Sequence, residues 1–357
     1  MGRVGNILKR IGKFLLWTVL VLVVLSGAFY IWLRIEPAEV TECDAGFQLV
    51  VNATGTDCVP NSPERIMLSS PIISQFFAAV DQPSAMTVVA WDRFAVADIP
   101  GLYEKHLEIN KDSVDLGDVQ SSAAQNLELL LLIDPDLIIA EYDPGTLEKP
   151  AEAIAPVIAL TDPSDWKGMT LFASDLIGER AEAERLLAEY QERVEILQAQ
   201  FDDPSAITIS NVSLIQGQTT VQLPASFSGA ILNDVGFSFP APQLALINEN
   251  PDLAEISISD ERIDLIDGDY LFIYGGFPDS TFETYYDTTT SSLVDDFRND
   301  PLFRFLNAEG AGQVEEVDMY WAEGGIYSAH YLLDDLFRYV AGVDPEEVAP
   351  NPLKLKD

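Results

Sequence analysis

The chain has 357 residues, enough for two domains, and 48% of them are hydrophobic, so sizeable cores can be buried. The first 34 residues contain five basic residues and no acidic residue, which leaves 15 basic against 58 acidic residues in 35–357, a formal charge of −43. A surface this acidic repels nucleic acid and anionic lipid, so no nucleic-acid partner is expected, and it suits an exposed and saline environment.

Residues 14–33 form the uncharged run FLLWTVLVLVVLSGAFYIWL, which is long enough to span about 30 Å of hydrocarbon as a helix. The basic segment 1–13 favours a cytoplasmic N-terminus, with the acidic remainder outside the membrane. Two interpretations are open, a retained transmembrane anchor and a signal peptide cleaved after Ala28. The apolar run continues past Ala28 to Leu33, which favours the anchor. Phe29 stands where a lipoprotein signal has its cysteine, so a lipid anchor is not expected.

Cys43 and Cys58 are the only cysteines, and they lie in a predicted linker at residues 34–63. A metal site would need more ligands nearby, and the sequence has none there. In an exported protein two neighbouring cysteines indicate a disulfide, and closing a loop of this length is worth about 3 kcal/mol. The alternative is a pair of buried free thiols.

Residues 64–164 alternate strands with helices, which is the pattern of a mostly parallel α/β domain. The hydrophobic runs predict strands at 64–70, 85–91, 136–142 and 155–160, and helices at 72–80 and 126–133.

Residues 165–203 contain no proline, and apolar residues recur at helical spacing from Leu176 to Phe201. The spacing predicts one long helix, and its last thirty residues alone would extend about 45 Å. Because this length exceeds what one α/β layer needs, we expect a rigid bridge between two lobes.

Residues 204–342 have the same alternation and predict a second α/β lobe, followed by a tail at 343–357. The predicted strands are 206–217, 269–276 and 313–321, and the predicted helices are 229–236 and 327–342. The expected fold class is therefore α/β, with two Rossmann-like lobes joined by one long bridging α-helix and preceded by an N-terminal transmembrane helix.

One phrase occurs in both predicted lobes. Residues 126–142 (NLELLLLIDPDLIIAEY) and 260–274 (DERIDLIDGDYLFIY) each place a glutamate six residues before one aspartate and eight before another. The glutamates are Glu128 and Glu261. The shared spacing indicates corresponding helix-to-strand joints in two similar halves.

The sequence has no signature of an enzyme. There is no GxSxG motif and no P-loop, and the glycines at 310–312 precede a predicted strand rather than a helix. His106 and His330 are the only histidines and lie far apart, so a histidine-built metal site is not expected. We therefore predict no catalytic residues, no metal site and no cofactor.

Ligands of open α/β sheets bind beyond the carboxyl ends of the strands. Aromatic and polar residues gather at these predicted ends, which suits a bulky, partly apolar small molecule. Taken singly, each is as compatible with a core or rim position as with ligand contact. Only nine Arg and six Lys follow residue 34, which favours a neutral or cationic ligand. The predicted ligand-binding residues are Ser70, Trp91, Arg93, Gln120, Tyr142, Gln216, Tyr274, Trp321 and Tyr327.

The motif Asn126-Leu127-Glu128 followed by Asp134-Pro135-Asp136-Leu137 resembles a signature of substrate-binding proteins of ABC importers for iron–siderophores, haem and cobalamin. The segments 63–66, 227–232 and 258–261 are similar to that family too, as is Trp321 followed by 332–336. The similarity covers about residues 60–342. It implies two α/β lobes bridged by one long helix, with the ligand between the lobes.

This resemblance implies an extracytoplasmic capture protein that delivers a ferric siderophore to an ABC permease and its ATPase. A hydroxamate-like siderophore is favoured, and the protein is expected to be a monomer. Iron would arrive already chelated, so the protein itself would need no cofactor. In the family one glutamate on each lobe docks onto arginines of the permease, and Glu128 and Glu261 match those places. The helix dipole alone also favours an acid early in a helix.

Three alternatives remain open. One is binding of haem or a corrinoid, with Tyr142, Tyr274 or Tyr327 as a haem iron ligand. The others are a membrane-tethered sensor and an exported enzyme on the same scaffold. The chain departs from the family at its N-terminus, where a whole apolar helix replaces the usual cleavable or lipidated leader.

Overall fold

A computed structural model describes residues 42–52, 55–80, 87–91, 114–115, 130–132, 134–141, 151, 153–160, 165–215, 218–276, 295, 297–322 and 324–354. The chain forms two units, Met1–Glu42 and Cys43–Asp357, and the fold below is that of the second unit. The predicted segments 1–13 and 14–33 lie outside the described residues. Within the described ranges, no helix has the length and apolar character needed to cross a membrane.

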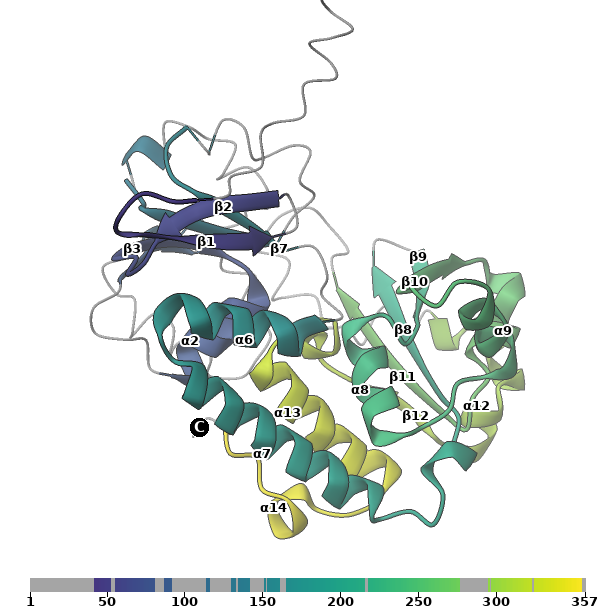
Figure 1. The fold of residues 1–357 in the computed structure, drawn as a ribbon. Helices are drawn as coiled ribbons and strands as arrows, with labels where there is room; N and C mark the ends of the chain where they lie inside the picture. Colours follow the sequence, from purple (N-terminus) through teal and green to yellow (C-terminus); the bar gives the residue numbers. More distant parts are fainter. Residues whose placement is uncertain are drawn as a thin grey trace, which may run out of the picture. The chain divides into compact units, whose positions relative to one another are not determined.

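The described part of the first lobe has a five-stranded parallel sheet in the order β5-β4-β3-β6-β7 (Figure 1). The central strands β3 and β6 are buried without alternation at Ile66–Leu68 and Leu137–Ile139, as in a sheet covered on both faces. This confirms the predicted parallel α/β lobe. The elements are β3 (Arg65–Ser69), α2 (Pro71–Ala79), β4 (Thr87–Trp91), β5 (Val114–Asp115), β6 (Leu137–Glu141) and β7 (Val157–Leu160).

The second lobe repeats this strand order as β10-β9-β8-β11-β12. Strands β8, β11 and β12 are parallel, but β9 and β10 are antiparallel additions that the sequence analysis did not predict. Strand β12 ends at Glu316, so the strand predicted over 313–321 is wrong beyond that residue. The strands are β8 (Ile209–Ile215), β9 (Gln218–Gln222), β10 (Glu255–Ile258), β11 (Tyr270–Gly276) and β12 (Val314–Glu316).

Helix α8 (Phe227–Val235) of the second lobe is capped by Gly236 in the left-handed region (φ 90°), as the sequence predicts. The other α-helices of this lobe are α9 (Ala241–Glu249), α12 (Asn307–Ala311), α13 (Ile326–Asp335) and α14 (Pro345–Val348). The lobe also has the 3-10 helices η3 (Pro204–Ala206), η4 (Asp260–Ile266), η5 (Phe303–Phe305) and η6 (Met319–Trp321), and the π-helix η7 (Leu336–Val340).

The repeated phrase marks equivalent joints in the two lobes. In the first lobe the Asp136 N–H donates to the Arg65 carbonyl at 2.8 Å, and the Asp136 carboxylate accepts the Arg65 N–H at 2.9 Å. In the second lobe Asp269 makes both bonds to Thr208, each at 2.8 Å. Each aspartate therefore ties the strand that follows it, β6 or β11, to the start of the central strand, β3 or β8.

The bridge between the lobes consists of two helices, α6 (Trp166–Ile177) and α7 (Arg180–Gln198), so the prediction of one continuous helix is wrong. Gly178 adopts a left-handed conformation (φ 75°) and ends α6. Helix α7 alone is about 28 Å long. One face of α7 is buried, including Leu186, Val194 and Leu197, because α7 packs on α6, α8 and α13.

The predicted linker 34–63 contains a β-hairpin of β1 (Phe47–Asn52) and β2 (Gly55–Pro60). The predicted disulfide between Cys43 and Cys58 is confirmed, with an S–S distance of 2.02 Å. Val50 and Val59 on the hairpin are buried in the main hydrophobic core. The linker interpretation is therefore wrong for this part, because the hairpin supplies core residues.

Candidate functional site

Five of the nine residues predicted to bind ligand have no described side chain. Arg93, Gln120, Tyr142 and Gln216 lie outside the described residues, and Trp91 ends β4 without a described side chain. Their role in ligand binding stays a prediction.

The other four predicted ligand-binding side chains are buried, each no more than 2% exposed. Ser70 caps helix α2, since its Oγ accepts the Ile73 N–H at 3.3 Å. Burial raises the pKa of Tyr274, while a hydrogen bond with Ser213 partly opposes that shift. The contact of these four residues with a ligand stays a prediction. They are Ser70, Tyr274, Trp321 and Tyr327.

Trp321 is held by two partners in the core of the second lobe. Its ring stacks on Phe272 with centroids 4.5 Å apart, and its indole N–H donates to an Asp335 oxygen at 2.9 Å. The Tyr320 hydroxyl donates to the same oxygen at 2.7 Å. This shared acceptor fixes both aromatic side chains of η6 against α13.

Burial raises the pKa of Asp335 to about 6, although its bonds to Trp321 and Tyr320 favour the charged form. Because the pKa is higher in the folded than in the unfolded protein, the contribution of Asp335 to the free energy of unfolding rises as the pH falls from about 6 to about 4. We expect the native chain to gain about 2 kcal/mol more than the Asp335→Asn variant over this range.

Urea unfolding of both proteins at about pH 7.5 and about pH 4.5 measures this difference. The buried His330, whose pKa is lowered by burial and by Arg193, acts in the opposite direction but equally in both proteins. An identical pH dependence in the two proteins would rule out Asp335 as the titrating group.

The two lobes also meet through helices α2 and α13. The Gln75 side chain donates to the Ser328 Oγ at 2.8 Å and accepts the Ser328 N–H at 3.0 Å, and both residues are buried. A Cβ at Gly325 would lie 2.2 Å from the Gln75 Oε1. This contact between the lobes was not predicted from the sequence. The one sequence feature that marks it is the adjacent pair Gly324-Gly325.

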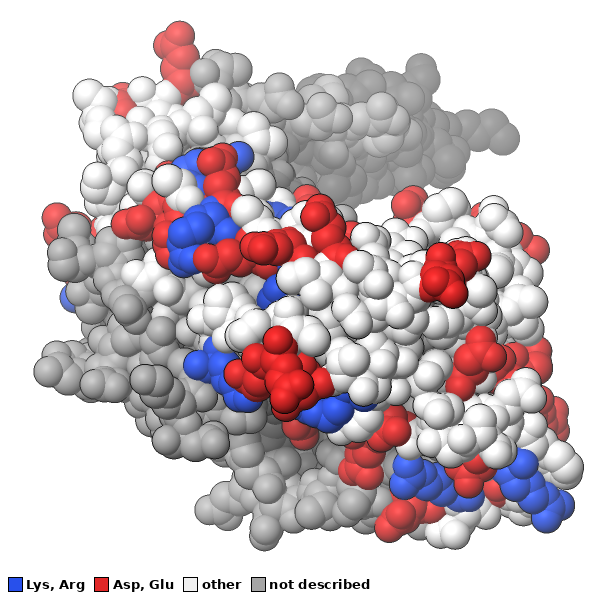
Figure 2. Space-filling model, turned by 90° about the horizontal axis from the view of Figure 1, so that it is seen from below, with Lys and Arg blue, Asp and Glu red and all other residues white. Residues whose placement is uncertain are grey.

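The described surface is acidic, and its cations are largely neutralised. Figure 2 shows one face on which Lys and Arg side chains lie beside Asp and Glu side chains. A ligand with a high negative charge would therefore find few free cations in the described part of the chain. The ion-paired cations are Lys167, Arg180, Arg185, Arg193, Arg262, Arg338 and Lys354.

The proposed docking residue Glu261 is exposed in the first turn of η4. Its neighbour Arg262 is already paired with Asp264 at 2.9 Å. Glu128 lies outside the described residues, so the docking role of both glutamates stays a prediction.

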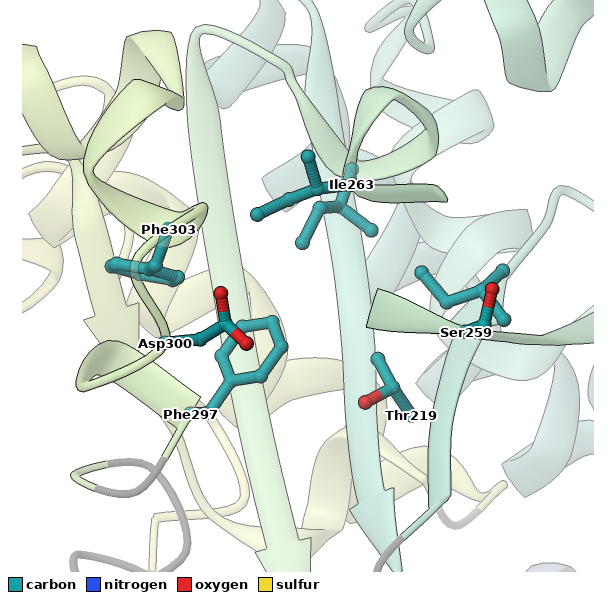
Figure 3. Close-up of a pocket in the computed structure, with 8 residues that line it drawn as sticks. Thr219, Ser259, Ile263, Phe297, Asp300 and Phe303 are labelled. Atoms are coloured by element: carbon teal, nitrogen blue, oxygen red, sulfur yellow. The ribbon is translucent and has the colours of Figure 1, made fainter. Parts of the chain in front are cut away.

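An apolar hollow lies beside η4 in the second lobe (Figure 3). It has an empty volume of about 290 Å³, part of it open to solvent, and none of the predicted ligand-binding residues lines it. We call it the η4 hollow; its lining residues are Thr219, Ile258, Ser259, Ile263, Ile266, Phe297, Asp300 and Phe303.

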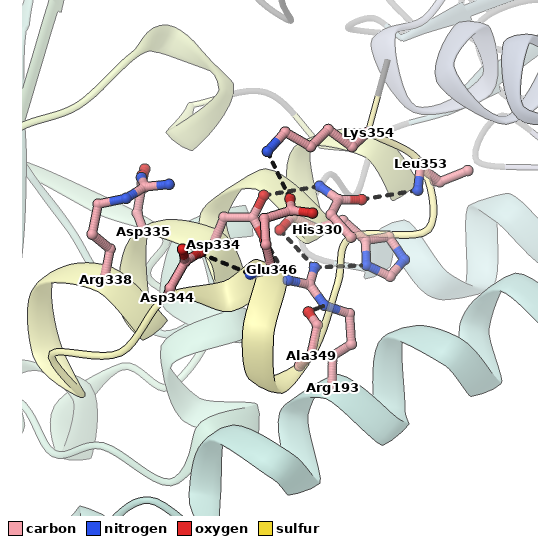
Figure 4. Close-up of polar contacts among 11 residues, drawn as sticks. Arg193, His330, Asp334, Asp335, Arg338, Asp344, Glu346, Ala349, Leu353 and Lys354 are labelled. Carbon is pink, nitrogen blue, oxygen red and sulfur yellow. Dashed lines mark hydrogen bonds and ion pairs between the residues drawn. The ribbon is translucent and has the colours of Figure 1, made fainter. Parts of the chain in front are cut away.

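A buried cluster of charged and polar groups fastens the C-terminal segment to the bridge (Figure 4). Arg193 of α7 pairs with Asp334 and donates to the carbonyl oxygens of His330 at 2.9 Å and Ala349 at 3.0 Å. The Asn351 amide donates to the second Asp334 oxygen at 3.1 Å. Ala349 and Asn351, which belong to the predicted tail 343–357, are therefore fastened to α7 and α13.

No metal site is visible in the described residues, since none of their His, Cys, Asp and Glu side chains form a group of three that would hold an ion. The buried His330 is also a poor ligand, because one ring nitrogen faces Arg193 at 3.0 Å.

Comparison with known proteins connects this fold to a family. The periplasmic binding protein family matches residues 78–319. The chain is 27% identical over 297 residues to "Probable siderophore-binding lipoprotein YfiY" of Bacillus subtilis, covering 81% of this chain and 86% of that protein. It is 29% identical over 225 residues to "Achromobactin-binding periplasmic protein" of Dickeya dadantii, covering 61% of this chain and 70% of that one.

Solved structures share the fold. The Staphylococcus aureus SirA structure complexed with staphyloferrin B superimposes with a TM-score of 0.69. The two chains are 22% identical, and the match covers 82% of this chain and 98% of that one.

Proposed function

Because the chain belongs to the periplasmic binding protein family, we propose that it is the extracytoplasmic binding component of an ABC importer for a ferric siderophore. The observation that carries this proposal is the pair of lobes with the same strand order and the same aspartate joint. Members of the family are binding proteins rather than enzymes, and one relative is named a probable siderophore-binding lipoprotein and another an achromobactin-binding protein.

The ligand in this proposal is a neutral or cationic iron chelate, with a hydroxamate-like one favoured. Most described cations are already ion-paired, which supports such a ligand. Arg93 is the basic residue that we assign to the ligand, together with the aromatic residues Trp91 and Tyr142 and the amides Gln120 and Gln216. Iron enters and leaves as part of the chelate, so the chain supplies no cofactor.

Haem is the second candidate, and the structure offers little support for it. Tyr274 and Tyr327 are no more than 2% exposed, so either would have to leave the core to reach an iron atom. A Soret band on mixing with haem, lost in a single Tyr→Phe variant, would favour haem over a siderophore.

We further propose that residues 14–33 anchor the protein to the cytoplasmic membrane and that its partners are a permease and an ATPase. The uncharged run supports the anchor. A secreted or periplasmic protein would result if the segment were cleaved.

The test of this function is uptake of radioactive iron by host cells that lack the chain, supplied as a ferric hydroxamate, a ferric catecholate or ferric citrate. We expect uptake of one chelate to be lost and to return when the native chain is restored. Unchanged uptake of all three chelates would contradict the proposed function.

A further inference from the structure

The hairpin of β1 and β2 (Figure 1) has an exposed apolar face, formed by side chains that alternate along β1. Phe47, Leu49 and Val51 are 44%, 44% and 73% exposed, and we call them the hairpin face. On the opposite side of the hairpin, Val50 and Val59 are buried in the main core. An antiparallel sheet with one side in the core normally carries polar side chains on its other side. The apolar hairpin face is therefore not explained by packing within the lobe.

The disulfide places the entry of the chain beside this same face. Leu49 and Cys58 are directly opposite each other in the hairpin register, so their side chains lie on the same side of the sheet. Cys58 is bonded to Cys43, and the Cα atoms of the two cysteines are 5.6 Å apart. Cys43 is the first residue of the folded unit Cys43–Asp357. The chain therefore enters this unit next to the hairpin face.

A short length of chain connects this entry point to the uncharged run 14–33. Cys43 follows Leu33, the last residue of the run, by ten positions in the sequence. Ten residues in a fully extended chain reach about 35 Å, so an anchor at 14–33 keeps Cys43 within that distance of the membrane. Such a tether gives the hairpin face a high effective concentration at the bilayer, and a few apolar side chains are then enough to hold it there.

The charge of the surrounding segment restricts the surface that can cover the hairpin face. Residues 35–64 contain six acidic residues and no Lys or Arg. An anionic lipid surface is repelled by this segment, whereas electrically neutral headgroups are not. A second copy of the chain carries the same negative charge, so the same repulsion opposes face-to-face pairing of two hairpins. A neutral bilayer surface is therefore the partner that fits both the apolar side chains and the charge.

We propose that the hairpin face lies on the outer leaflet of the membrane, with Phe47, Leu49 and Val51 inserted at the boundary between headgroups and acyl chains. This contact holds the first lobe against the bilayer in one orientation, whereas a tether alone would let it rotate freely. The inference rests on the retained anchor of the proposed function, and it does not depend on which chelate the protein binds.

Nitroxide labels in the full-length chain, reconstituted in phosphatidylcholine vesicles, test this contact. The native chain offers no thiol to the label, because its two cysteines form the disulfide. Leu49→Cys carries the label on the hairpin face. The matched control is Leu244→Cys, which replaces a leucine that is 38% exposed on α9 of the second lobe. Electron paramagnetic resonance compares the access of each label to oxygen, which concentrates in lipid, with its access to a water-soluble nickel chelate. We expect the oxygen-to-nickel ratio to be several-fold higher at position 49 than at position 244.

A second variant shows whether the hairpin face itself makes the contact. Phe47→Ser with Val51→Ser in the Leu49→Cys protein should bring the ratio down to the value at position 244, because the apolar surface is removed. Equal ratios at positions 49 and 244 without these two changes would overturn the inference. Spectral broadening at position 49 that disappears on dilution with unlabelled protein would also overturn it, because a second copy would then cover the face. So would release of the chain from the vesicles by cleavage within residues 14–33.

Chelate binding by the same reconstituted protein separates this inference from the proposed function. A high ratio at position 49 in a chain that binds no ferric chelate would support the membrane contact and contradict the proposed function. Normal chelate binding with equal ratios at positions 49 and 244 would do the reverse.

Discussion

Replacement of Arg193 by methionine is expected to lower the free energy of unfolding by about 3 to 5 kcal/mol, because it leaves the Asp334 carboxylate buried without its cation. The side chains of the pair are only 4% and 9% exposed. The same guanidinium satisfies the carbonyl oxygens of His330 and Ala349. The substitution therefore removes a charge partner and two hydrogen bonds at once, and we expect it to release the segment around Ala349.

Urea unfolding checks this value, with Arg185→Met on the same helix as the matched control. Arg185 also pairs with two glutamates, but its side chain is 49% exposed, so we expect its loss to cost less than about 1 kcal/mol. The double variant Arg193→Met with Asp334→Leu should recover much of the loss, because no unpaired charge is left. Similar costs for Arg193→Met and Arg185→Met would show that the buried cluster does not hold the tail.

Charge reversal of both Glu128 and Glu261 to arginine is expected to abolish iron uptake while the affinity for the chelate stays unchanged. Each carboxylate is proposed to meet an arginine of the permease, so reversal replaces attraction by repulsion on both lobes. Glu261 is exposed and its reversal breaks no ion pair with a described residue, so we expect little loss of stability.

The control for this experiment reverses two glutamates elsewhere on the surface. Glu192 and Glu195 are exposed on α7, and their replacement by arginine changes the net charge by the same amount. Uptake and chelate binding are measured for both double variants. Normal uptake by the Glu128→Arg and Glu261→Arg protein would refute the docking assignment.

The backbone pattern of this chain was predictable where local chemistry decides it. The Asp-x-Asp phrase of each lobe places Asp136 and Asp269 at the same joint, and the uninterrupted apolar run of β6 marks a strand buried on both faces. Gly178 was also visible in the sequence, but the helical spacing on both sides of it suggested one helix. The helix break depends on the left-handed conformation that this glycine adopts.

Long-range packing was not predictable in the same way. The hairpin of β1 and β2 has the composition of a linker, yet Val50 and Val59 find the core. Arg193 has the helical spacing of an ordinary surface residue, and only the fold brings it to Asp334 and to the carbonyl oxygen of Ala349. Trp321 was predicted at the end of a strand, but it lies in η6, where it stacks on Phe272 and donates to Asp335.

The central claim is that this chain captures an intact ferric siderophore, and calorimetric titration of the full-length protein in detergent tests it most directly. The titrants are a ferric hydroxamate, a ferric catecholate, ferric citrate, haem and cobalamin, each ferric chelate paired with its iron-free form. We predict saturable, sub-micromolar binding of one ferric siderophore and much weaker binding of the same molecule without iron. Binding of none of the ferric chelates, or equal binding with and without iron, would contradict the account.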